Sequence, residues 1–113
     1  MFEIDFDDEE LKTAEHWHGG QSSMLYAVCS TGSLSLGTRR PQHPDEDRPM
    51  TDAEWFARIA WDLSAEAEEC VDSARKQVKG KRGAERAELK TDINALLSIA
   101  WKATIAAERA EKG

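Results

Sequence analysis

The feature that most constrains this chain is a pair of long amphipathic segments between Thr51 and Ala110. In the first segment apolar residues recur every three or four positions, the period of a helix that buries one stripe. These residues are Phe56, Ile59, Ala60, Leu63, Ala67, Cys70, Val71, Ala74 and Val78. The second segment repeats the pattern with Leu89, Ile93, Leu96, Leu97, Ala100, Thr104 and Ala107. Two such stripes joined by a short turn predict an antiparallel helical hairpin over residues 51–110.

Local signals predict where these two helices begin and end. Thr51 followed by Glu54 has the form of a capping box at the start of the first helix. The turn reads Gly80-Lys81-Arg82-Gly83, and we expect Gly80 to end the first helix in a left-handed conformation. Basic residues gather around this turn, where the end of a helix dipole favours cations.

Residues 1–36 predict a small N-terminal unit that begins with a strand and a short helix. Phe2–Phe6 alternates apolar and acidic residues, which is typical of a half-buried strand. Asp7 or Asp8 then provides an N-cap for a helix that runs to about Trp17 or His18.

A second short helix is expected from Met24 to about Ser30, capped by Ser22 or Ser23 and stopped by Gly32. Ser33–Leu36 alternates again, so it can pair with Phe2–Phe6 as a two-stranded β-ribbon laid on the helices. The predicted fold is therefore mainly α: a long antiparallel hairpin packed with two short helices and a possible ribbon.

The length of 113 residues favours a single domain. Within it, residues 37–50 contain all three prolines and the acidic run 45–47, which predicts a loop between the N-terminal unit and the hairpin. The apolar runs are too short to span a bilayer and the first residues lack a basic segment, so we expect a cytoplasmic protein.

Net charge of −7 is concentrated in the first half of the chain, because residues 1–50 carry ten acids against four bases. Like charge repels the phosphates of nucleic acids, so direct nucleic-acid binding is disfavoured. The densest acidic cluster is Asp7, Asp8, Glu9 and Glu10. It predicts either a solvated helix start or a strip that docks on a basic partner, and the basic hairpin turn is one internal candidate.

Residue types that carry metal or nucleophilic chemistry are present without a known spacing. His16, His18, His43, Cys29 and Cys70 are donors for zinc, but no paired C-x2-C motif accompanies them. The two cysteines lie in apolar stretches, so we expect reduced, buried thiols. No metal ligand or catalytic residue is predicted from this set.

Three tryptophans lie away from the apolar stripes. At about 100° per residue, Trp61 projects roughly 135° from the centre of its stripe, Trp55 roughly 105° and Trp101 roughly 85°. Such side chains require a second layer, which is the N-terminal unit, a second subunit or another protein. Because tryptophan is enriched at interface hot spots, we predict a homodimer or a dedicated partner-binding face.

One further pattern is Glu66-x-x-Glu69 on the first helix, with Glu85, Glu88 and Asp92 on the second. It resembles the all-α nucleotide pyrophosphatases of the MazG type over about residues 63–100. That resemblance implies magnesium bound by Glu66, Glu69, Glu88 and Asp92. The spacing between Glu88 and Asp92 is four residues where the family has three, so this function is the alternative.

The leading expectation from the sequence is a small, acidic, non-catalytic protein-binding module without a cofactor. By composition it resembles small phage or mobile-element proteins that act as stoichiometric inhibitors or nucleic-acid mimics on host nucleic-acid enzymes. The expected partner-binding residues are Trp55, Trp61, Trp101, Asp7, Asp8, Glu9 and Glu10. The expected partner is a protein with a basic surface. A structural oligomer subunit is the further alternative.

Overall fold

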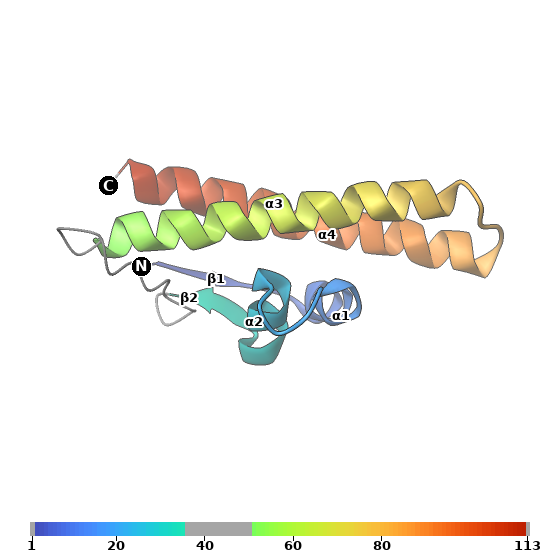
Figure 1. Cartoon of the computed structure of the whole chain (residues 1–113), viewed down its shortest axis with the longest axis horizontal. Helices are drawn as coiled ribbons and strands as arrows, with labels where there is room; N and C mark the ends of the chain where they lie inside the picture. The colour runs from blue at the N-terminus through green and yellow to red at the C-terminus, as the bar shows by residue number, and fades with distance from the viewer. Residues whose placement is uncertain (1, 36–50, 113) are drawn as a thin grey trace.

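The computed structural model describes residues 2–35 and 51–112. Its elements follow the order β1 (Glu3–Asp5), α1 (Asp8–Trp17), α2 (Met24–Thr31), β2 (Ser33–Ser35), α3 (Asp52–Val78) and α4 (Ala84–Glu111). Figure 1 shows α3 and α4 side by side as a long hairpin, with the shorter elements gathered on one of its sides. The predicted mainly helical fold, with its hairpin and small N-terminal unit, is confirmed. The loop predicted over 37–50 lies outside the described residues.

The predicted helix caps are present. The hydroxyl of Thr51 accepts a hydrogen bond from the Glu54 amide at 3.1 Å, which satisfies a backbone donor at the start of α3. Asp7 caps α1 and Ser23 caps α2 in the same way. Gly32 ends α2 with a left-handed φ of 81°. Each cap is an interaction between residues close in sequence, which is why the sequence predicted it.

The turn of the hairpin differs from the prediction in one detail. α3 ends at Val78, and its last carbonyls accept from the amides of Gly80 and Lys81 three residues later. This tight last turn satisfies the orphan carbonyls without a left-handed residue, so the prediction for Gly80 is wrong. The left-handed glycine is Gly83, with a φ of 67°, directly before α4.

A two-stranded antiparallel sheet joins the ends of the N-terminal unit. β1 pairs with β2 so that Ile4 lies opposite Leu34. Both side chains are buried, whereas the neighbouring acids Glu3 and Asp5 are exposed. The predicted ribbon is confirmed, and its apolar face lies on the hairpin.

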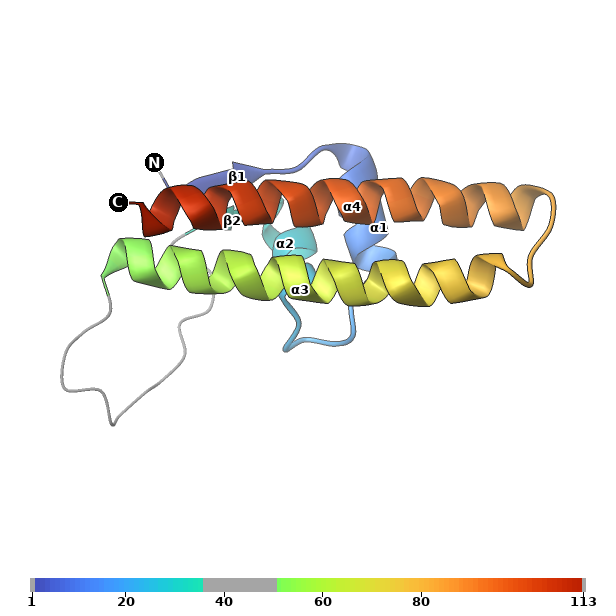
Figure 2. The same cartoon turned by 90° about the horizontal axis from the view of Figure 1, so that it is seen from above.

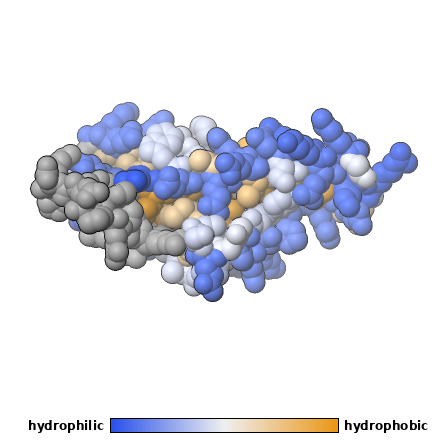
Figure 3. All heavy atoms as spheres, in the orientation of Figure 1, coloured by the Kyte–Doolittle hydropathy of each residue, from blue (hydrophilic) through white to orange (hydrophobic). Residues whose placement is uncertain are grey.

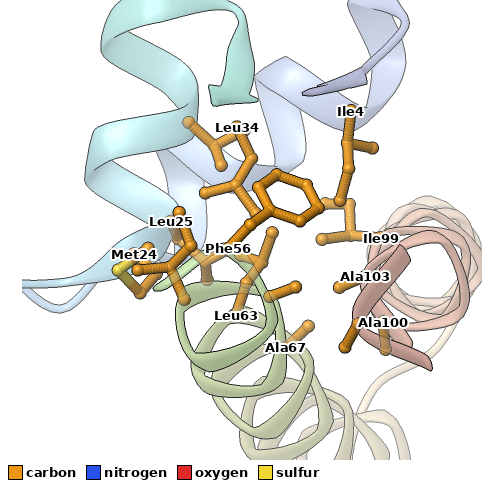
Figure 4. Close-up of a cluster of buried hydrophobic side chains, with 14 of the residues drawn as sticks. Ile4, Met24, Leu25, Leu34, Phe56, Leu63, Ala67, Ile99, Ala100 and Ala103 are labelled. Carbon is orange, nitrogen blue, oxygen red and sulfur yellow. The ribbon is translucent and has the colours of Figure 1, made fainter. Parts of the chain in front are cut away.

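The core is centred where the N-terminal unit meets the middle of the hairpin. Figure 4 shows Ile4, Leu25 and Leu34 from the N-terminal unit directed toward Phe56 and Leu63 of α3. Small buried side chains fill the contact between α3 and α4, so the two backbones approach closely; they include Ala60, Ala67, Ala100, Ala103 and Ala107. In the part of the chain that the structure describes, no helix is long and apolar enough to cross a membrane.

Trp55 belongs to this core, with only 4% of its surface exposed. Eleven residues, or about three helical turns, separate it from Glu66, so both residues lie on the same side of α3. Glu66 contacts α2, as described below, so this side faces the N-terminal unit. The prediction that Trp55 contributes to a partner-binding face is therefore wrong.

Candidate binding surface

The hairpin has two sides with different surroundings. We call the side that carries the N-terminal unit the covered face and the opposite side the open face. Figure 2 looks onto the open face, and no described element lies across it. It is formed by Trp61 and Ser64 of α3 and by Leu97, Trp101 and Thr104 of α4.

Helix geometry places these residues away from the N-terminal unit. On α4, Ser98 and Lys102 contact Glu10 of α1, and this pair defines the direction of the covered face. At about 100° per residue, Leu97 and Thr104 lie roughly opposite this direction. Trp101 lies between the two directions, at the edge of the open face.

The open face carries the large apolar side chains that remain exposed among the described residues. The exposed fractions are 38% for Trp61, 40% for Leu97 and 69% for Trp101. Leu97 was predicted in the buried stripe, which is wrong because the stripe of α4 is rotated toward the N-terminal unit and includes Ile99 and Ala103 instead. The outward projection predicted for Trp61 and Trp101 is confirmed.

A polar pair lies between the two helices on this side. The hydroxyls of Ser64 and Thr104 are 2.8 Å apart, and Ser64 is buried. These short side chains satisfy one another, so they bring the helices together without adding bulk. The exposed Trp61 and Trp101 precede Ser64 and Thr104 by three residues on the two antiparallel helices.

Each exposed tryptophan has a defined setting. The Trp61 Nε1–H donates to Glu111 Oε1 at 2.8 Å, which fixes the indole across the end of α4. Trp101 borders a groove of about 760 Å³ between β1 and the last turns of α4. Its lining includes the apolar side chains of Phe2 and Ile105 and the cation of Arg109.

The covered face is held by a buried ionic contact. Glu10 of α1 is 2% exposed, and its carboxylate accepts from Lys102 Nζ at 2.6 Å and from Ser98 Oγ at 2.8 Å. The same carboxylate accepts from the Asp7 amide at 3.0 Å, which completes a capping box. One side chain therefore both starts α1 and joins it to α4.

Two further polar contacts attach the N-terminal unit to the hairpin. The Trp17 Nε1–H donates to Asp92 Oδ2 of α4 at 3.0 Å. The carboxylate of Glu66 in α3 accepts from the amides of Met24 and Leu25 at 2.9 and 3.2 Å. Glu66 thereby caps α2 from outside, where the helix dipole favours an anion.

The predicted acidic strip is divided by this arrangement. Glu10 is turned into the protein, so its assignment to a partner-binding strip is wrong, and Asp7 serves as the N-cap of α1. Asp8 and Glu9 remain exposed in the first turn of α1. Since the first turn of a helix favours acids, the helix dipole of α1 also accounts for the presence of these two acids without a partner protein.

The carboxylates of the magnesium alternative lie in structural contacts. Glu66 binds the start of α2 and Asp92 binds Trp17, while Glu69 and Glu88 are exposed. Within residues 2–35 and 51–112, no group of three or more histidine, cysteine or acidic side chains is arranged to hold a metal ion. The predicted sharing of one magnesium ion by Glu66, Glu69, Glu88 and Asp92 is therefore not supported by their placement.

The cysteines are separate, half-buried thiols. Burial raises the pKa of Cys70, and the carboxylates of Glu66 and Glu69 raise it further. Burial also raises the pKa of Cys29, with Glu15 acting in the same direction. The thiolate is the reactive form, so both side chains are poor nucleophiles at neutral pH.

Two of the three histidines lie in the described part of the chain. The rings of His16 and His18 pack edge-on against Trp17 and Tyr26 respectively. His43, the remaining donor of the zinc set, lies outside the described residues.

Comparison of the chain with protein-family models, with curated proteins and with solved structures gave no match. Lys102 and Ser98 are the important residues that sequence reasoning missed. A lysine outside an apolar stripe gives no signal of its own, and only the position of Glu10 reveals its role.

Proposed function

We propose that this chain is a non-catalytic protein-binding module whose contact surface is the open face of the hairpin. One observation carries the proposal: Trp61, Leu97 and Trp101 remain exposed on one side of a hairpin whose other side carries the N-terminal unit along much of its length. Isolated exposed apolar residues are common, but three large ones gathered on one face are typical of an interaction surface.

The energetics of tryptophan favour binding at this face. Burying one indole against a partner contributes about 1.5–3 kcal/mol by area. Tryptophan is enriched among the residues that dominate binding energy, especially near the centre of an interface. Trp61 is also held in place by Glu111, so it loses less conformational freedom on binding than a mobile side chain.

The polar groups support a binding role over a catalytic one. Glu66 and Asp92 attach the N-terminal unit, and Glu10 is paired with Lys102. The raised pKa values of Cys29 and Cys70 disfavour nucleophilic attack. The carboxylates of Glu10, Glu66 and Asp92 therefore have structural roles.

The inhibitor or nucleic-acid mimic expected from the sequence receives less support than apolar docking. A mimic of phosphates needs a row of carboxylates directed outward. Only Asp8 and Glu9 of the predicted strip are both exposed and outside the capping pair of α1. We therefore place the contact on the open face and not on the start of α1.

Site-specific photo-cross-linking in cells of the native host tests this proposal. A photo-reactive benzoyl-phenylalanine replaces Leu97 in one variant and Gln21, an exposed residue of the N-terminal unit, in a control. We expect a discrete covalent adduct from position 97 on irradiation and none from position 21. No adduct at position 97, or the same adducts from both positions, would contradict the proposal.

A further inference from the structure

The open face is large enough for a stable interface. α3 and α4 contain 27 and 28 residues, so the hairpin is about 40 Å long at 1.5 Å per residue. Two helices packed about 10 Å apart present a strip of roughly 700 Å² on one side. A specific complex buries about 800 Å² on each partner, so a partner of matching length fits this face.

Charge along the hairpin is strongly uneven. The basic tip, defined as residues 75–90, carries seven bases against two acids. The acidic half of α3, defined as residues 51–74, carries seven acids against one base. Figure 3 shows hydrophilic residues covering the tip, whereas apolar residues come to the surface along the middle of the molecule. Each molecule therefore has a positive end and a negative body along its long axis.

A second copy of the chain matches both properties. We propose that the open faces of two copies pack against each other with the hairpins antiparallel, so that the basic tip of each copy lies over the acidic body of the other. This inference rests on the proposed binding role of the open face and names its occupant. A parallel arrangement would place the two basic tips together, which is unfavourable because like charges repel.

The apolar residues are well placed for this arrangement. A two-fold axis that passes between Leu97 and Trp101 brings these residues of one α4 against the same residues of the other. Such a self-complementary contact is the usual form of a dimer interface. Leu97 lies thirteen residues from Ala84, the start of α4, or about 20 Å, so the two tips are separated by about 40 Å.

Sedimentation of the full chain across a wide concentration range tests the identity of the occupant. We expect a monomer–dimer equilibrium that weakens as salt is raised, since screening reduces the attraction between tip and body. Trp101→Glu should weaken the dimer by about tenfold or more, which corresponds to about 1.4 kcal/mol. Gln21→Glu adds the same charge on the N-terminal unit and should leave the equilibrium unchanged.

Distance measurement between spin labels tests the orientation. A label on Arg82→Cys, in a Cys29→Ser and Cys70→Ser background, reports the separation of the two tips. The antiparallel arrangement predicts about 40 Å, and a parallel one predicts less than about 20 Å. Dilution below the dissociation constant should remove the signal.

Three results would overturn the second-copy inference: a chain that stays monomeric at every concentration, a dimer that Trp101→Glu does not weaken, or tips that lie close together. These failures are distinct from failure of the proposed function. A cross-linked adduct at position 97 that contains a different protein keeps the open face as a binding surface and removes the second copy as its occupant.

Discussion

The two faces of the hairpin carry different kinds of side chain, although the same two helices form both. On the covered face, apolar side chains are interspersed with polar anchors, and each anchor has a partner at 2.6–3.2 Å. On the open face, the side chains of Leu97 and Trp101 are exposed and the helices are joined by the small Ser64–Thr104 pair, with no described layer above them. The contrast separates residues that stabilise the fold from residues that are available to a partner.

The polar anchors also explain how a small N-terminal unit holds its position. Its elements are short, and a two-stranded ribbon is marginal without support. Glu10, Trp17 and the backbone at Met24 each bond to a different point along α3 or α4. Three directional contacts fix the orientation of the unit, while the buried apolar residues supply most of the stability.

The largest expected difference between the faces is in the cost of removing a leucine. Leu63→Ala should lower the free energy of unfolding by about 2–5 kcal/mol, because Leu63 is fully buried and truncation leaves a cavity. Leu97→Ala should cost less than about 1 kcal/mol in the monomer. Urea unfolding followed by circular dichroism at low protein concentration measures both. Equal costs would mean that the two faces are packed alike.

A smaller effect is expected from breaking the ionic contact of the covered face. Lys102→Met keeps an unbranched side chain one atom shorter but leaves the buried Glu10 carboxylate without its cation, at a cost of about 1–3 kcal/mol. Hydrogen exchange should accelerate over residues 2–35 more than over the hairpin. Lys112→Met, an exposed position at the end of α4, is the control and should change neither quantity. Uniform acceleration along the whole chain would show that the N-terminal unit does not open separately.

The smallest effect concerns the carboxylate that caps α2. Glu66→Gln replaces one carboxylate oxygen with an NH2 group, so only one of the Met24 and Leu25 amides keeps its acceptor. It also removes the negative charge at the helix start. The expected loss is about 1–2 kcal/mol, from the lost charge near a helix end and from the lost hydrogen bond. Glu68→Gln, two residues away and exposed, should have no effect on unfolding. If both variants lower the free energy of unfolding equally, the effect of Glu66 comes from the net charge of the protein and not from its contact with the start of α2.

Local features of this fold could be predicted from sequence, and features set by tertiary packing could not. The helix caps act within one helical turn, so the local sequence indicates their roles. These caps are Thr51, Asp7, Ser23 and Gly32. The ribbon followed from alternation of residue type. The left-handed conformation predicted for Gly80 was wrong. The carbonyls of α3 accept hydrogen bonds from the amides of Gly80 and Lys81, and these bonds close the helix end.

Burial of single residues was less predictable, because it depends on how many neighbours a helix has. The apolar stripe of α3 was centred on one partner helix, yet α3 packs against both α4 and the N-terminal unit. Its buried arc is therefore wider and includes Trp55. On α4 the buried stripe is turned toward the N-terminal unit, so it includes Ile99 and Ala103 and leaves Leu97 exposed. Glu10 was assigned to the surface because an acid gives no indication of a lysine ninety-two positions away.

Adjacent leucines of α4 offer the most direct test of the claim that the open face serves binding and the covered face serves folding. Leu96 is fully buried and Leu97 is 40% exposed, so Leu96→Glu and Leu97→Glu place the same charge on opposite sides of this boundary. Urea unfolding and sedimentation on the same samples measure stability and self-association together. We expect Leu97→Glu to keep the monomer's unfolding free energy within about 0.5 kcal/mol and to weaken association by about tenfold or more, while Leu96→Glu prevents stable folding. A Leu97→Glu variant that unfolds like Leu96→Glu, or one that associates like the unmodified chain, would contradict the account.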